Sequence, residues 1–187
     1  MAEKKRWKTK PLECWTKAKE VTKTHFSSIT TAHERGELAS LWGLGIESGH
    51  GIAIESGFGN TCHSIAGEHY AGHSANLGSS EEFVEAAEAR GYARDVCAYM
   101  RVNLGSMYLN KYVFGGPYPK VDFVARTHQC DTHAKWALAE AEFLKVPYHC
   151  VETVEGYQFD SAQSQKNKVD YLIGQTLDAI EWMEKTT

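Results

Sequence analysis

The chain has 187 residues, of which 42% are hydrophobic and 11% aromatic, so it can build the core of one folded domain and is not a disordered protein. Its net charge of -4, with one basic cluster at residues 4–10, excludes the broad positive surface of a nucleic-acid-binding protein. No apolar run is long enough for a membrane span, no signal peptide is recognisable, and the five cysteines are odd in number, so we expect a cytoplasmic protein with free thiols.

The first predicted elements are a helix, a strand and a glycine-rich segment. Pro11 precedes loosely spaced apolar residues that run to Gly36, which predicts a helix closed by that glycine. Residues 38–44 predict a strand. Residues 43–59 contain many glycines but lack a G-x-G-x-x-G pattern, and G-K-[ST] occurs nowhere in the chain. A phosphate-binding P-loop is therefore excluded, and the glycines indicate tight turns.

A polar segment follows, which we predict to be a loop. It contains Cys62, His63, His69 and His73, and these residue types bind zinc. Their spacing matches no familiar zinc motif, so histidines on the surface or along a pocket are the competing interpretation.

Residues 80–108 predict one or two helices with an apolar face. Cys97 lies on or beside that face, where a cysteine belongs more often to the core than to a metal site. Arg90, Arg94 and Arg101 give the same segment a basic side that suits an anionic group, and Lys135 is a further basic candidate.

The most informative segment changes from a strand to a helix around Cys130. Residues 121–126 alternate as a mostly buried strand does, Asp131 and Thr132 are typical of a helix start, and residues 134–145 are good helix formers. Ligands collect at the carboxyl ends of strands in an open α/β sheet, and helix N-termini stabilise a thiolate. Cys130 is therefore predicted to be a nucleophile or a metal ligand; the simpler interpretation is a small buried hydrophobic residue.

The remaining pattern completes an α/β fold. Residues 147–151 predict a second strand, so strand, helix and strand form a right-handed unit with parallel strands. Apolar residues from Val169 to Met183 step by three and four, which predicts an amphipathic C-terminal helix. We expect a Rossmann-like or flavodoxin-like parallel sheet in an α/β lobe at residues 37–187, preceded by a helical arm at residues 1–36.

Two fragments together resemble a known family. They are DVCAYMRVNLG at Asp95–Gly105 and HQCDTHAKW at His128–Trp136, the latter followed by a VPY strand at Val146–Tyr148. They resemble the 2-hydroxyacyl-CoA dehydratase and benzoyl-CoA reductase family. The opening KKRWKTKPLECW from Lys4 and MYLNKYVFGG from Met107 are most similar to the N-terminal portion of the B-type subunit of an ATP-dependent benzoyl-CoA reductase.

The resemblance implies a [4Fe-4S] cluster. In that family each such subunit holds a cluster through three cysteines, and the matching positions here are Cys97 and Cys130. They are the cofactor- and metal-binding residues that we predict. The family's third ligand comes from a second, C-terminal lobe for which this sequence has no counterpart. The resemblance identifies no catalytic residue.

The implied function is that of an oxygen-sensitive oxidoreductase subunit in anaerobic aromatic degradation. It would reductively dearomatise an aromatic acyl-CoA beside a paired cluster-binding subunit, using low-potential electrons from ATP-hydrolysing partner subunits. The alternatives are a 2-hydroxyacyl-CoA dehydratase subunit, which eliminates water through a ketyl radical, and a non-catalytic truncated lobe that acts as an interaction module. We expect no nucleic-acid or membrane partner, and an exposed apolar face where another lobe or partner packs.

Overall fold

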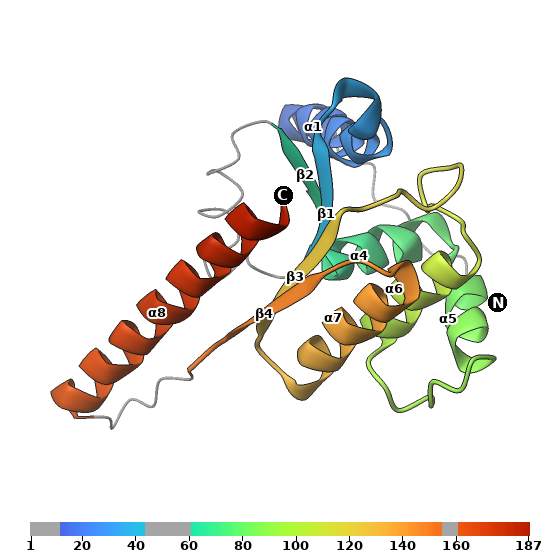
Figure 1. The fold of residues 1–187 in the computed structure, drawn as a ribbon. Coiled ribbons are helices and arrows are strands. Elements are labelled where there is room, and N and C mark those ends of the chain that lie inside the picture. Colours follow the sequence, from blue (N-terminus) through green and yellow to red (C-terminus); the bar gives the residue numbers. More distant parts are fainter. Residues whose placement is uncertain (1–11, 44–60, 155–160) are drawn as a thin grey trace.

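The centre of the molecule is a four-stranded parallel sheet with the order β2-β1-β3-β4 (Figure 1). The computed structural model describes residues 12–43, 61–154 and 161–187. The strands are β1 Leu38–Gly43, β2 Cys62–Ile65, β3 Phe123–His128 and β4 Tyr148–Glu152. All three neighbouring pairs are parallel, which confirms the predicted α/β class.

The strand order creates a topological switch point between β1 and β3. From β1 the chain moves to β2 at one edge and then returns past β1 to β3. The strand that follows β1 in the chain therefore lies toward one edge of the sheet, and the strand that follows β3 lies toward the other edge. Ligands of open α/β sheets bind where the carboxyl ends of two such strands meet. The connection after β3 leads to Cys130.

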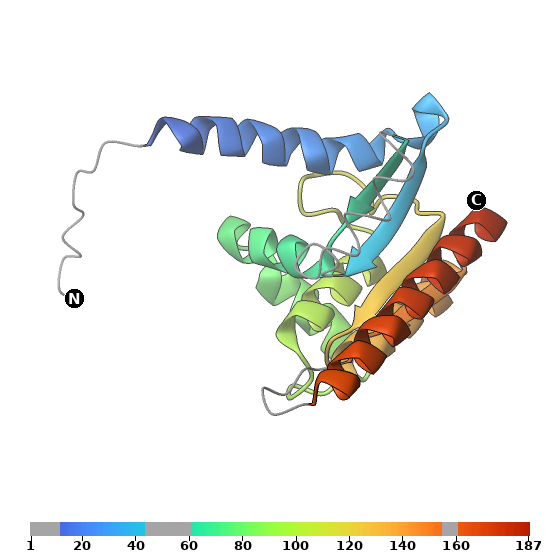
Figure 2. The same cartoon turned by 90° about the vertical axis from the view of Figure 1, so that its left-hand side faces the viewer.

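Helices cover both faces of the sheet. Figure 1 and Figure 2 show α8 on one face and α4, α6 and α7 on the other, with α1 beside the β2 edge. The described helices are α1 Glu13–Thr30, the short 3-10 helix η1 His33–Arg35, α4 Gly67–Leu77, α5 Ser80–Glu88, α6 Ala98–Tyr108, α7 Asp131–Leu144 and α8 Ala162–Thr186.

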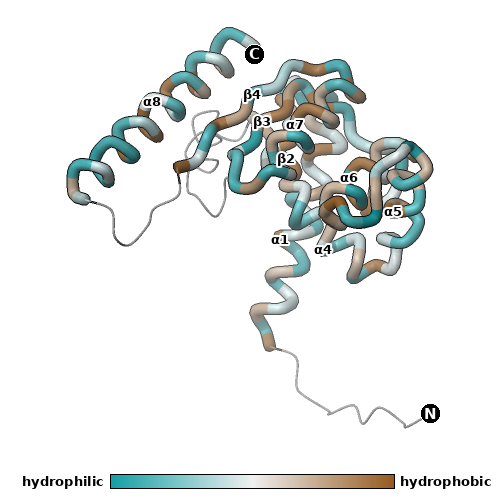
Figure 3. Tube along the Cα trace, turned by 90° about the horizontal axis from the view of Figure 1, so that it is seen from below, coloured by the Kyte–Doolittle hydropathy of each residue, from teal (hydrophilic) through white to brown (hydrophobic). Residues whose placement is uncertain are grey.

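Side chains alternate between two cores along the strands, as the two-residue period of a strand requires. Leu41 and Val124 face the main core with Tyr70, Leu104 and Trp136 from three helices. Their sequence neighbours face α8 instead, in a smaller core of Trp42, Phe123, Ala125, Val151, Ala179 and Met183. In Figure 3, α8 is largely hydrophilic with separate hydrophobic patches along its length.

Two of the elements predicted from sequence, at residues 11–36 and 62–73, are wrong. The predicted helix over residues 11–36 ends at Thr30, and Gly36, with φ +72°, closes η1 instead. The predicted loop at residues 62–73 is strand β2 followed by α4. Gly67 by itself would favour a flexible loop, but a side chain there would overlap Trp136, so the glycine allows close packing.

The other predicted elements are confirmed with small shifts. Residues 38–44 contain β1, residues 80–108 contain α5 and α6, and the segment around Cys130 contains β3 and α7. The second strand and the C-terminal helix are β4 and α8. The glycine-rich prediction lies almost entirely outside the described residues.

Candidate functional site

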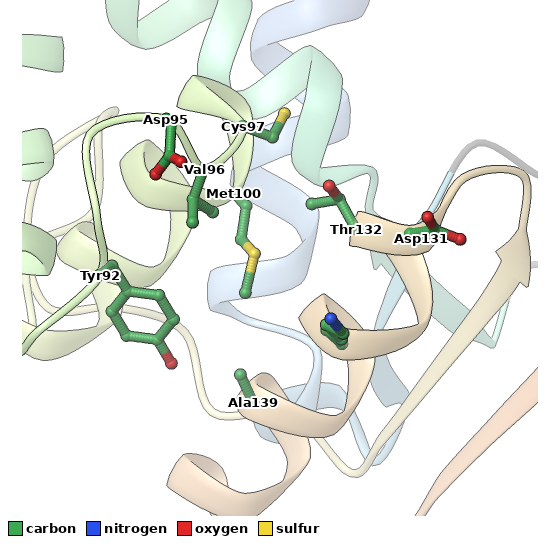
Figure 4. A pocket seen from close by; sticks show the side chains of 9 residues that line it. Tyr92, Asp95, Val96, Cys97, Met100, Asp131, Thr132 and Ala139 are labelled. Carbon is green, nitrogen blue, oxygen red and sulfur yellow. The ribbon is translucent and has the colours of Figure 1, made fainter.

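A cleft of about 500 Å³ opens beside the first turns of α6 and α7 (Figure 4). Its walls combine apolar side chains with two carboxylates and one amine. The lining residues are Tyr92, Asp95, Val96, Cys97, Met100, Asp131, Thr132, Lys135 and Ala139.

Cys97 lies at the N-cap position of α6 and lines this cleft. Its carbonyl oxygen accepts a hydrogen bond of 3.1 Å from the N–H of Arg101, which begins the helix. Its half-buried side chain packs against the main core and makes no capping hydrogen bond. Cys97 therefore touches the core, as the pattern indicates, but it also borders a cavity.

Cys130 lies at the N-cap position of α7, two residues after the last residue of β3 and at the switch point of the sheet. Its carbonyl oxygen accepts a hydrogen bond of 2.9 Å from the N–H of His133, and its side chain is exposed. The next two residues, Asp131 and Thr132, line the cleft. The predicted place of Cys130 between a strand end and a helix start is confirmed. Two helix N-termini that favour negative charge, each with a cysteine, thus border one cleft.

The three arginines predicted to attract an anionic group are used mainly within the protein. Arg101 is 11% exposed and donates to Glu88 at 2.5 Å, and Arg94 donates to the other oxygen of Glu88 at 3.2 Å. The guanidinium of Arg90 lies 4.3 Å from the centre of the Tyr108 ring. Lys135 is the basic residue that lines the cleft.

A buried ionic network lies beneath the start of α7. The fully buried Arg126 of β3 donates to Glu140 at 2.8 Å and to Glu68 at 3.3 Å, with its guanidinium 3.9 Å from the Trp136 ring centre. His133 Nε2 lies 3.0 Å from the same oxygen of Glu68. The network joins the first turns of α4 and α7 to the end of β3. It therefore holds the start of α7, where Cys130 is the N-cap residue, in a fixed position.

Burial and charge act against each other on the two carboxyls of this network. Burial by itself would raise the pKa of Glu68, but the hydrogen bond from His133 and the charge of Arg126 hold that pKa below its ordinary value. Burial raises the pKa of Glu140 above its ordinary value, although Arg126 opposes this. No local pattern in the sequence predicts this network, and its available signal is a charged residue, Arg126, inside a mostly apolar strand.

Cys97 lines the cleft and Cys130 directly precedes its lining residue Asp131, whereas the other three cysteines lie on other elements. Cys14 is exposed on α1, Cys62 lies in β2, and burial raises the pKa of the Cys150 thiol in β4 to about 11. Within residues 12–43, 61–154 and 161–187, no group of three or more histidine, cysteine or acidic side chains is placed to hold a metal ion. Cysteine thiols suit an iron–sulfur cluster, but the described residues do not complete a ligand set for one.

A family profile described as 2-hydroxyglutaryl-CoA dehydratase, D-component, matches residues 58–187, which include Cys97 and Cys130. The chain belongs to this family. It is also similar to the (R)-phenyllactyl-CoA dehydratase alpha subunit of Clostridium sporogenes, with 32% identity over 121 residues, which are 64% of this chain and 29% of that subunit. The (R)-2-hydroxyisocaproyl-CoA dehydratase alpha subunit of Clostridioides difficile is 31% identical over 115 residues, which are 61% of this chain and 27% of that subunit.

Membership of the D-component family confirms the broader part of the resemblance. Both relatives are named as dehydratase subunits, so the dehydratase alternative fits better than the benzoyl-CoA reductase interpretation, which is not supported. The aligned segments span less than a third of either relative's length. Across the described ranges, no helix is long and apolar enough to cross a membrane.

Proposed function

We propose that this D-component chain is part of an enzyme that removes water from a 2-hydroxyacyl-CoA, and that the cleft beside α6 and α7 forms part of the active site. The observation that carries the proposal is the pair of cysteines at two helix N-termini around one cleft, in a chain similar to two dehydratase alpha subunits. A cytoplasmic location suits its free thiols.

In this proposal Cys97 and Cys130 supply two thiolate ligands to a [4Fe-4S] cluster. The bound cluster would supply single electrons and an iron site able to polarise a thioester carbonyl. The remaining ligand comes from outside the described residues. The chain contributes the two helix N-termini, which favour the negative charge of thiolates, and the network of Arg126, Glu68 and His133 that fixes the start of α7.

Other lining residues of the cleft can bind and orient the substrate. Lys135 lies on α7 within one and a half turns of Cys130 and carries the positive charge that a phosphate of coenzyme A needs. Met100, Val96 and Ala139 give an apolar wall for an acyl chain and exclude water from it. Asp95 and Asp131 add acceptors for a substrate hydroxyl.

Two other functions remain as alternatives. The opening motif from Lys4 resembles a benzoyl-CoA reductase subunit, which would act on an aromatic acyl-CoA. The incomplete ligand set among the described residues favours a non-catalytic interaction module. In either enzyme, a paired cluster-binding subunit and ATP-hydrolysing subunits that deliver electrons are the proposed partners.

The first test of the ligand assignment is the iron and sulfide content of protein purified without oxygen. We expect near-equal iron and sulfide in the natural chain and their loss in Cys97→Ala and in Cys130→Ala. The matched control is Cys14→Ala, because Cys14 is exposed on α1, outside the cleft lining. Iron retained in both the Cys97 and the Cys130 variant would overturn the assignment. A folded protein without iron would favour the interaction module.

Substrate conversion tests the reaction itself. The chain is assembled with candidate partner subunits and a low-potential reductant, and is given either a 2-hydroxyacyl-CoA or benzoyl-CoA. We expect an enoyl-CoA product from the first and no consumption of the second. The opposite pattern would replace the dehydratase proposal with the reductase one.

A further inference from the structure

The C-terminal helix α8 is only partly covered by the rest of the described molecule. It has 25 residues, but only Ala179 and Met183, both in its second half, are buried against the sheet. Figure 1 shows it lying along one face of the sheet, and Figure 3 shows it standing apart from the helices of the other face. Most of its surface is therefore open to solvent.

An apolar stripe runs along this open surface. Val169, Ile173, Leu177 and Ile180 are between 38% and 60% exposed. They follow one another at intervals of four, four and three residues, so they share one side of the helix. The stripe lies beside the buried side of α8, and its own side chains are not used by the small core of Ala179 and Met183.

Charged residues continue the stripe at both ends with opposite signs. Lys166 precedes Ile173 by seven residues, and Glu184 follows Leu177 by seven residues, so each lies two turns along the same side. Both are exposed. Ile173 and Leu177 lie at equal distances along the helix on either side of Gln175, and so do Lys166 and Glu184. The charge is positive at one end of this arrangement and negative at the other.

We propose that α8 pairs with α8 of a second copy of this chain, antiparallel and across a two-fold axis level with Gln175. A two-fold interface uses the same surface on both molecules and must be complementary to itself. In this register Ile173 of each copy meets Leu177 of the other, and Lys166 meets Glu184. The axis passes on the stripe side, since Gln175 itself faces the sheet and accepts a hydrogen bond from the Glu152 N–H at 3.3 Å.

The size of the stripe sets the strength of this association. A helix of 25 residues is about 37 Å long, and a single pair of such helices lies at the lower end of the roughly 1,200–2,000 Å² that stable interfaces bury. We therefore expect a dimer that dissociates on dilution, with a dissociation constant in the range of about 1–100 µM. This inference does not depend on the proposed reaction.

Sedimentation equilibrium of the whole chain at several concentrations tests the pairing. The natural chain should shift from monomer to dimer as its concentration rises, and Leu177→Lys should remain monomeric at the highest concentration. The matched control is Tyr171→Lys, because Tyr171 is 46% exposed on the same helix but lies off the stripe. A natural chain that is monomeric throughout overturns the proposal, and so does a dimer that Leu177→Lys leaves intact.

A charge exchange tests the antiparallel register. Lys166→Glu and Glu184→Lys should each weaken the dimer at least several-fold, because each places like charges opposite one another in both halves of the interface. The double variant should recover most of the natural affinity, since the pairs are restored with reversed signs. Circular dichroism verifies that each variant keeps its helix content. Two single losses that simply add in the double variant would overturn the register.

Discussion

Arg126 is the single side chain whose ion pairs join α4 and α7 to the end of β3, next to Cys130. Replacing it with Met leaves Glu140 and Glu68 buried without their cation, so we expect a loss of about 3–5 kcal/mol in the free energy of unfolding. Urea unfolding measures this loss. Arg94→Met is the control, since Arg94 is 89% exposed and its single ion pair contributes little. Equal stability of the two variants would mean that the network does not support the fold.

A second residue-scale prediction concerns two glycines in helices. Any side chain at Gly105 in α6 would overlap the Phe83 carbonyl of α5, so Gly105→Ala should cost about 1–3 kcal/mol of stability. Gly174 in α8 has open space around it, so Gly174→Ala should stabilise the chain by up to about 1 kcal/mol, because alanine favours a helix. Thermal unfolding of both variants measures the difference, and an equal shift for the two would contradict the close packing of α5 on α6.

The sequence predicts single residues well when their surroundings are local. Cys130 could be placed because the strand before it and the helix start after it are its direct neighbours. Arg126 could not be understood in the same way, because its partners Glu140 and Glu68 are 14 and 58 residues away along the chain. The cleft beside Cys97 is hard to predict from sequence for the same reason, since its two sides come from separate helices.

At the level of elements, packing overrides composition in α4. The segment from Cys62 to His73 is polar and contains Gly67 and Gly72, which predicts a loop from local preference alone. Tyr70 and Ala71 of this segment are nevertheless buried, and Glu68 joins the ionic network. These tertiary contacts stabilise the helix in spite of its glycines. By contrast α7 and α8 have good local signals and could be predicted from sequence.

The contact of β4 with α8 should make stability depend on pH. His149 of β4 stacks on Trp182 of α8 at 5.2 Å, and burial lowers its pKa below the ordinary value of 6.5, which Asp178 only partly offsets. As the pH falls through about 6.5, the unfolded chain takes up this proton more readily than the folded one, so the free energy of unfolding decreases. Above that pH the imidazole is neutral in both states and this effect vanishes.

His149→Phe tests this origin of the pH dependence. Phenylalanine keeps an aromatic ring against Trp182 but cannot be protonated, so the variant should lose less stability than the natural chain between about pH 7.5 and 5.5. Urea unfolding at both pH values gives the comparison. Parallel losses in the two proteins would assign the pH dependence to other groups.

At the level of the whole molecule, the sequence predicted the α/β class, the parallel unit around Cys130 and the broad family. The substrate-level assignment to benzoyl-CoA reductase is not supported, because the family profile and both relatives are described as dehydratases. That assignment rested on the opening segment from Lys4 and the segment from Met107, whereas the two cysteine contexts carried the family. The order β2-β1-β3-β4 could not be predicted, since no local pattern specifies which strands become neighbours. The extent of the lobe, residues 37–187, stays a prediction.

The pairing of β1 with β3 has a consequence for how this chain reaches its native state. Asp122, at the entrance to β3, accepts a hydrogen bond from the Ala39 N–H of β1 across 83 residues, whereas His128 of β3 and Glu152 of β4 are 24 residues apart. Closing the longer loop costs more entropy, and non-local pairing slows folding. The β3-α7-β4 unit can therefore collapse first and serve as the template on which β1 docks, so Cys130 would take its place before the rest of the switch point is formed.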